Sequence, residues 1–179
     1  MVAAWALVLG GLLRVIGEVL EIVAGGHTNA SGLFAGAGLT GVAIGFFGLW
    51  RDVRQSTVGQ LAVVLIAIGA LGFTAIAIWS VGRDTLAMAD VVRMPAFMVV
   101  AAITLIGALC LAAWLIATPA YPRWIGMVMS ISIGLSLLSS FVALPPLVQP
   151  LIDMVMALTF IQLGLSMRER RKQQARVTR

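Results

Sequence analysis

The side chains best able to do chemistry lie together in one apolar stretch, LLRVIGEVLEIVAGGH, residues 12–27. Arg14, Glu18 and Glu21 place three formal charges within eight residues of it. On a helix with Arg14 set at zero, Glu18 falls at about 40° and Glu21 at about −20°. One stripe therefore carries a guanidinium and two carboxylates, and this combination can form an ion pair and bind a proton or a cation.

The composition of the chain indicates the environment in which this charged stripe lies. Of 179 residues, 61% are hydrophobic and only 11% are charged, and the mean hydropathy is +1.06. Soluble domains have about 25% charged residues. The composition therefore predicts an integral membrane protein.

Composition also argues against several other classes. One His and one Cys leave no familiar zinc or haem ligand set, so we expect no metal and no cofactor. The net charge of +5 does not indicate a nucleic-acid-binding protein, because half of the twelve Lys and Arg lie in the last twelve residues, without a folded basic domain around them. No paired nucleophile and base appears, so we expect no enzyme.

Six apolar segments are long enough to be membrane-spanning helices, which need about 20 residues each. The sequence therefore predicts an all-α bundle of six transmembrane helices with short loops over residues 1–167, followed by a basic tail over 168–179. The expected helices are 2–23, 33–50, 58–81, 95–117, 124–144 and 147–167. The tail is expected to be a few turns of helix or disordered.

Basic residues predict the orientation of the bundle. With the N-terminus inside, the cytoplasmic side receives Arg51, Arg54, Arg123 and the six basic residues of the tail, whereas only Arg83 and Arg93 fall on the opposite side. The positive-inside rule favours this arrangement, with both termini cytoplasmic, in the cell's inner membrane. The basic tail is expected to contact anionic lipid.

Other polar residues are expected near the charged stripe. Glu21 and Asp153 lie near the outer ends of the first and sixth helices, with His27 close above them. Two acids and a histidine at one depth could form a proton relay or a cation site. Gln162 is a further member of this expected polar network, since a mid-membrane amide needs partners. The alternative is structural: Arg14 and Glu18 form a clasp, and Glu21, His27 and Asp153 contact water at the interface.

The second expected helix carries glycines at helical spacing. Gly38, Gly41, Gly45 and Gly48 repeat along it. Small residues let helix backbones approach closely in lipid, so these positions are expected to pack against another helix. The pattern also permits a homo-oligomer or a partner membrane protein.

Two functions from different classes follow. The first is a non-enzymatic membrane protein that binds or translocates a small solute or a proton at the charged stripe. The second is an accessory or structural subunit that packs against another membrane protein. Six helices in a chain of this length resemble the substrate-binding subunits of energy-coupling-factor vitamin transporters in topology and length alone, and function does not follow from likeness at that level.

Overall fold

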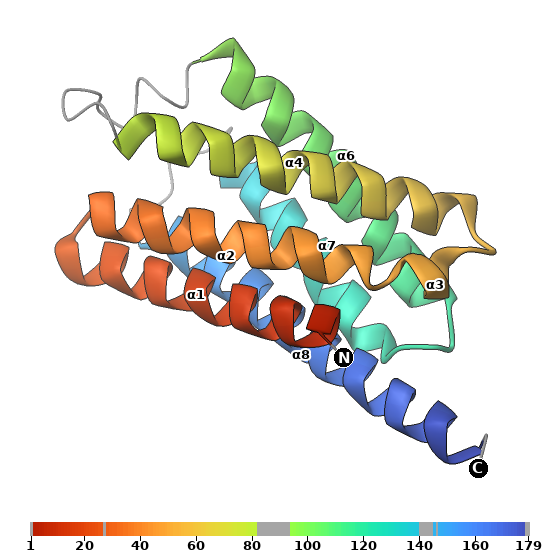
Figure 1. Ribbon diagram of the computed structural model, residues 1–179. Helices are drawn as coiled ribbons and strands as arrows, with labels where there is room; N and C mark the ends of the chain where they lie inside the picture. Colours follow the sequence, from red (N-terminus) through yellow and green to blue (C-terminus); the bar gives the residue numbers. More distant parts are fainter. Residues whose placement is uncertain (1, 27, 82–93, 140–144, 146, 178–179) are drawn as a thin grey trace.

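The computed structural model describes residues 2–26, 28–81, 94–139, 145 and 147–177, and all of its regular structure is helical. This confirms the all-α fold. Figure 1 shows the seven helices of the described residues, which are α1 (Val2–Ala24), α2 (Asn29–Phe47), α3 (Trp50–Val53), α4 (Thr57–Val81), α6 (Pro95–Ala117), α7 (Arg123–Ser139) and α8 (Val148–Val177).

The second helix differs from the expected 33–50 at both ends. Its N-cap is Thr28, whose side chain accepts a 3.0 Å hydrogen bond from the Ser31 amide. The Thr28 amide donates to the Ser31 hydroxyl in return, at 2.9 Å. This reciprocal capping starts α2 at Asn29, four residues earlier than expected. The helix ends at Phe47, and Trp50 begins the separate short helix α3.

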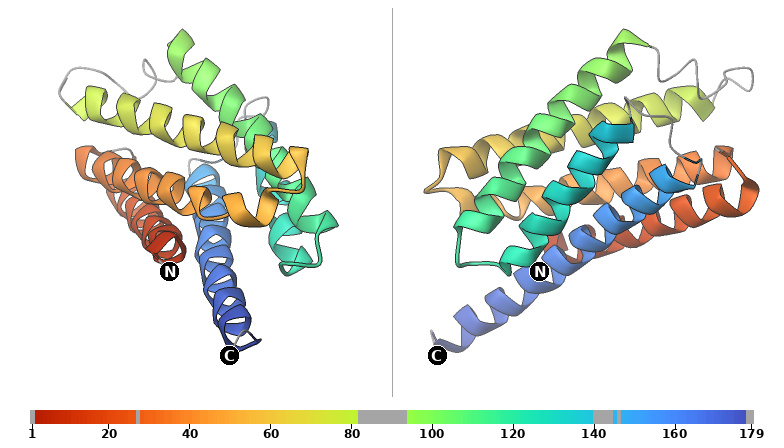
Figure 2. Two further views of the ribbon diagram at one scale, coloured as in Figure 1. Left: turned by 45° about the vertical axis from the view of Figure 1, so that its right-hand side comes forward. Right: turned by 180° about the vertical axis from the view of Figure 1, so that it is seen from behind.

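The six long helices form a closed ring. Each packs against the next one along the chain, from α1 to α2, α4, α6, α7 and α8, and α8 returns to pack along α1. Figures 1 and 2 show the consequence: the first and last helices lie side by side, and the C-terminal part of α8 projects beyond the bundle.

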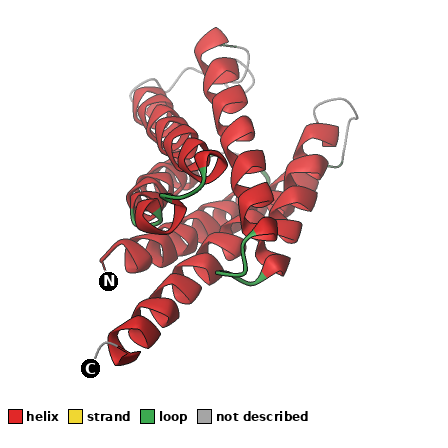
Figure 3. Cartoon of the chain, turned by 90° about the vertical axis from the view of Figure 1, so that its right-hand side faces the viewer, coloured by secondary structure: helices red, strands yellow, loops and turns green. Residues whose placement is uncertain are grey.

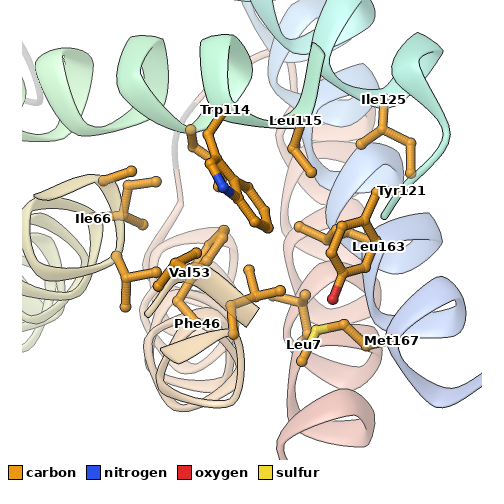
Figure 4. Close-up of a cluster of buried hydrophobic side chains, with 14 of the residues drawn as sticks. Leu7, Phe46, Val53, Ile66, Trp114, Leu115, Tyr121, Ile125, Leu163 and Met167 are labelled. Carbon is orange, nitrogen blue, oxygen red and sulfur yellow. The ribbon is translucent and has the colours of Figure 1, made fainter. Parts of the chain in front are cut away.

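The ring is filled by apolar side chains mainly at the end that holds α3. Figure 4 shows this core, in which Leu7, Phe46, Trp114, Leu163 and Met167 point toward one another from four different long helices. These residues are buried. They come from the first turns of α1 and the later parts of α2, α6 and α8, so the hydrophobic core lies at one end of the bundle.

A glycine seam joins α1 to α2. A Cβ atom added to Gly10 would lie 2.6 Å from the Gly38 carbonyl oxygen, and one added to Gly45 would lie 2.6 Å from the Leu7 Cβ. Gly41 and Gly48 also face α1. The three predicted packing glycines of α2, together with Gly48 directly after it, are thus covered by α1 of the same chain.

Four of the helices are long and apolar enough to cross a membrane, namely α2, α4, α6 and α8. Large apolar side chains such as Leu33, Ile68, Met98 and Leu151 are exposed on them. An outer surface of this kind is suited to lipid. The structure therefore fits a membrane protein. Two of the long helices are not among these four, because α7 has only 17 residues and α1 carries three charges.

The basic tail continues α8 without a break, as far as Val177. Its first arginines bind back to the bundle. Arg168 lies over the Trp5 ring, 4.8 Å from its centroid, and Arg171 donates a 2.9 Å hydrogen bond to the Gly48 carbonyl oxygen. The beginning of the tail is therefore part of the folded structure.

The glycine seam generates a stability prediction. We expect Gly10→Ala to lower the free energy of unfolding by about 1–3 kcal/mol, because its methyl group would meet α2 backbone that cannot move independently. Gly134→Ala is the control, since nothing lies within 4 Å of the added Cβ. The control should be neutral or stabilising by up to about 1 kcal/mol, because alanine is the better helix former. Unfolding in mild detergent measures both, and equal effects would contradict the assigned seam.

Candidate functional site

The charged stripe of α1 contains a close ion pair. The Arg14 Nη2 atom lies 2.7 Å from Oε1 of Glu18, one turn further along the helix. The Glu18 side chain is buried, with 6% of its surface exposed, and that of Arg14 is 19% exposed. The pair faces into the ring of helices rather than toward the lipid side.

Helix α8 supplies a second carboxylate to the same arginine. The Arg14 Nη2 atom is 4.0 Å from Oδ2 of Asp153. One guanidinium is thus shared between two acids from two helices. The Asp153 side chain is 31% exposed, so the cluster extends from the buried Glu18 to an accessible edge.

Close packing of α1 against α8 brings Arg14 and Asp153 near each other. A Cβ added to Gly11 would lie 2.8 Å from the Ala157 carbonyl oxygen, and one added to Gly164 would lie 2.7 Å from the Ala4 carbonyl oxygen. The two helices therefore run antiparallel with their backbones nearly in contact. One turn beyond the Gly11–Ala157 contact, the same register places Arg14 opposite Asp153.

An amide and a hydroxyl extend the cluster to a third helix. The Gln149 Nε2 atom donates to Oδ2 of Asp153 and to the Ser136 hydroxyl, each at 3.3 Å. Ser136 belongs to α7. The site, called here the polar cluster, consists of Arg14, Glu18, Ser136, Gln149 and Asp153.

The other residues predicted for this site have different positions. Glu21 lies one turn beyond Glu18 on α1 and is half-buried. Gln162 is half-buried on α8, but it follows Asp153 by nine residues and so lies on the opposite side of the helix, about 13 Å further along its axis. His27 lies outside the described residues.

Gln149 was missed by the sequence analysis. Its only signal is its position four residues before Asp153, which places both side chains on one face of α8. Gln162 was the expected member of the network because its amide lies nearer the middle of the predicted span. Which amide faces α1 depends on the rotation of α8, and helix rotation is set by packing.

The polar cluster combines one cationic side chain with two acidic ones. Within the described residues, no three side chains of His, Cys, Asp and Glu gather where they could hold a metal ion. The cluster contains one guanidinium and two carboxylates, so with all three ionised it carries one surplus negative charge. A proton or a small cation can neutralise that surplus.

Comparison with known proteins found no matching protein family, no similar curated protein and no similar solved structure.

The shared arginine leads to a prediction about stability. We expect Arg14→Met to be the most destabilising single change in the cluster, by about 3–5 kcal/mol, because it leaves two carboxylates without their cation. Glu18→Gln should cost less, since Arg14 keeps Asp153 as its partner. The loss in Arg14→Met should shrink as the pH falls, because protonation removes the uncompensated charge.

Thermal unfolding in detergent across a pH series measures these effects. Glu169→Gln is the matched control, because it removes an exposed carboxylate from α8 outside the cluster. If Arg14→Met and Glu169→Gln had the same effect at neutral pH, the ion pair would have no structural importance.

Proposed function

We propose that this chain is a non-enzymatic, multi-pass protein of the cell's inner membrane that binds or translocates a small solute or a proton at the polar cluster. The observation that supports it most strongly is the sharing of Arg14 between Glu18 and Asp153. The surplus negative charge favours a proton or a cationic solute over an anion.

The depth of the cluster supports this function. Arg14 is near the middle of α1, which has 23 residues from Val2 to Ala24. An ionisable group at the centre of a bilayer costs about 2.5–3.5 kcal/mol on insertion scales, and such groups usually mark a pathway or a binding site. A bound proton or cation would remove the charge that the arginine leaves unbalanced.

The proposed topology has six spanning helices, with α1 and α7 added to the four apolar ones, and both termini in the cytoplasm. It is supported by the distribution of basic residues. Arg170 is more than 100 residues away from Arg51 and Arg54 in the sequence, yet all three line one pocket at the same end of the bundle. The positive-inside rule expects arginines to gather at the cytoplasmic face, so this end of the bundle is proposed to be the cytoplasmic one.

Proton flux in liposomes tests the function. Purified protein is reconstituted, a potassium diffusion potential is imposed, and internal pH is followed with a trapped dye. We expect flux in the wild type, and we expect Asp153→Asn and Glu18→Gln to reduce it at least tenfold because each removes a carboxylate of the cluster. Glu169→Gln should leave the flux unchanged.

Solute binding is measured in parallel for small cations that carry no exchangeable proton. Saturable binding that requires Asp153 would identify a cationic solute as the ligand. Unchanged proton flux and unchanged cation binding in both cluster variants would contradict the proposal. If wild-type protein showed neither activity and copurified with a stoichiometric membrane partner, the accessory-subunit alternative would be favoured.

A further inference from the structure

A basic pocket lies at the end of the bundle that holds α3. It has a volume of about 880 Å³, and its polar lining comes from Arg51, Asp52, Arg54, Gln55, Thr118 and Arg170. These residues belong to the connection from α2 to α4, the connection from α6 to α7, and α8. Figure 3 shows the loops of both connections in green on the side facing the viewer, whereas α3, which contains Arg51 and Asp52, is red like the other helices. A volume of this size is within the usual range for small-molecule sites.

The pocket has a strong excess of positive charge. Its lining holds three arginines and one aspartate, which leaves a net charge of +2. The one carboxylate is already engaged. Asp52 accepts a hydrogen bond from the Tyr121 hydroxyl, and its Oδ1 atom is 3.9 Å from Nη1 of Arg170. The guanidinium groups of Arg51 and Arg54 are exposed and supply the excess.

The third arginine is held in place by its neighbours. Arg170 lies over the Tyr121 ring, 5.2 Å from the ring centroid, and Asp52 binds its guanidinium. Tyr121 is buried, and burial together with its hydrogen bond to Asp52 raises the pKa of the phenol above its ordinary value. The phenol therefore remains a neutral hydrogen-bond donor at physiological pH, and the Tyr121–Asp52–Arg170 network is fixed before any ligand binds.

Two exposed tryptophans lie close in sequence to the residues that line the pocket. Trp50 directly precedes Arg51 and is 41% exposed, and Trp124, the second residue of α7, is 47% exposed. Exposed tryptophans concentrate at the headgroup level of membranes. Guanidinium groups bind phosphate through paired N–H donors.

We propose that this pocket binds a phosphate-bearing anion through Arg51 and Arg54, with Arg170 forming its fixed wall. Two sources share this chemistry: the headgroup of an anionic phospholipid and a free phosphate compound. The proposal differs from a general attraction of lipid to the basic tail, since only Arg170 of the tail lines the pocket. It is also independent of the polar cluster, which involves neither connection.

The test compares two pairs of substitutions with equal charge change. Arg51→Gln/Arg54→Gln removes two charges from the pocket, and Lys172→Gln/Arg176→Gln removes two exposed charges from the tail outside it. Full-length protein in a neutral detergent is titrated with short-chain phosphatidylglycerol, with short-chain phosphatidylcholine, or with inorganic phosphate. Native mass spectrometry counts the bound molecules.

We expect saturable binding of phosphatidylglycerol to the wild type, weakened at least about tenfold in the pocket variant and less than about twofold in the tail variant. Gln55→Glu should also weaken binding, because it adds a negative charge to the pocket while keeping every arginine. This variant keeps the test decisive if the arginine double variant fails to fold.

The different probes distinguish a phospholipid headgroup from a free phosphate compound. Binding of phosphatidylglycerol that inorganic phosphate does not displace assigns the pocket to a lipid headgroup. Binding of inorganic phosphate alone, lost in the pocket variant, assigns it to a soluble phosphate compound. Equal weakening in the pocket and tail variants, or no saturable binding of any probe, would overturn the proposal.

Discussion

An arginine inside an apolar bundle must be matched by negative charge, and much of this structure is arranged around that requirement. Arg14 is paired with Glu18 on its own helix and with Asp153 on α8. The second pairing requires the first and last helices of the chain to lie side by side in one register. Gly11 and Gly164 permit that approach, because neither has a side chain to separate the backbones.

The closure of the ring divides the bundle into two ends with different physical character. At the α3 end, apolar side chains fill the interior and arginines surround a pocket near the surface. Away from that end, further along α1 and near the start of α8, the interior contains the polar cluster. A tightly packed end gives α1 and α8 a rigid base, which holds the charged groups of the cluster at fixed distances.

The sequence predicted the helices well because apolar length and loop punctuation are local signals. The expected 95–117 helix matches α6, and the expected 58–81 helix begins within one residue of α4. The start of α2 was placed too late because the expected start followed the apolar run, while the helix starts at the Thr28–Ser31 capping contacts. The packing role of Gly38, Gly41, Gly45 and Gly48 was predicted from their spacing, but their partner helix α1 was not, because spacing does not identify the facing helix.

The candidate site was also predictable only as far as local sequence signals reach. The stripe of Arg14, Glu18 and Glu21 follows from helical geometry, and Asp153 was expected at a similar depth. The choice of Gln149 over Gln162 and the contact of Asp153 with Arg14 depend on the rotation and register of α8, which are tertiary properties. The tail was expected to act through its total charge, whereas Arg168 and Arg171 bind specific groups of the bundle.

The most direct test of the central claim is a double-mutant cycle between Arg14 and Asp153. Unfolding free energies in detergent at neutral pH are measured for the wild type, Arg14→Met, Asp153→Asn and the double variant. Residues in contact within one charged network couple by about 0.5–3 kcal/mol, and this account predicts a favourable coupling in that range. Additivity of the two changes to within about 0.3 kcal/mol would contradict it, since Arg14 and Asp153 would then not interact across α1 and α8.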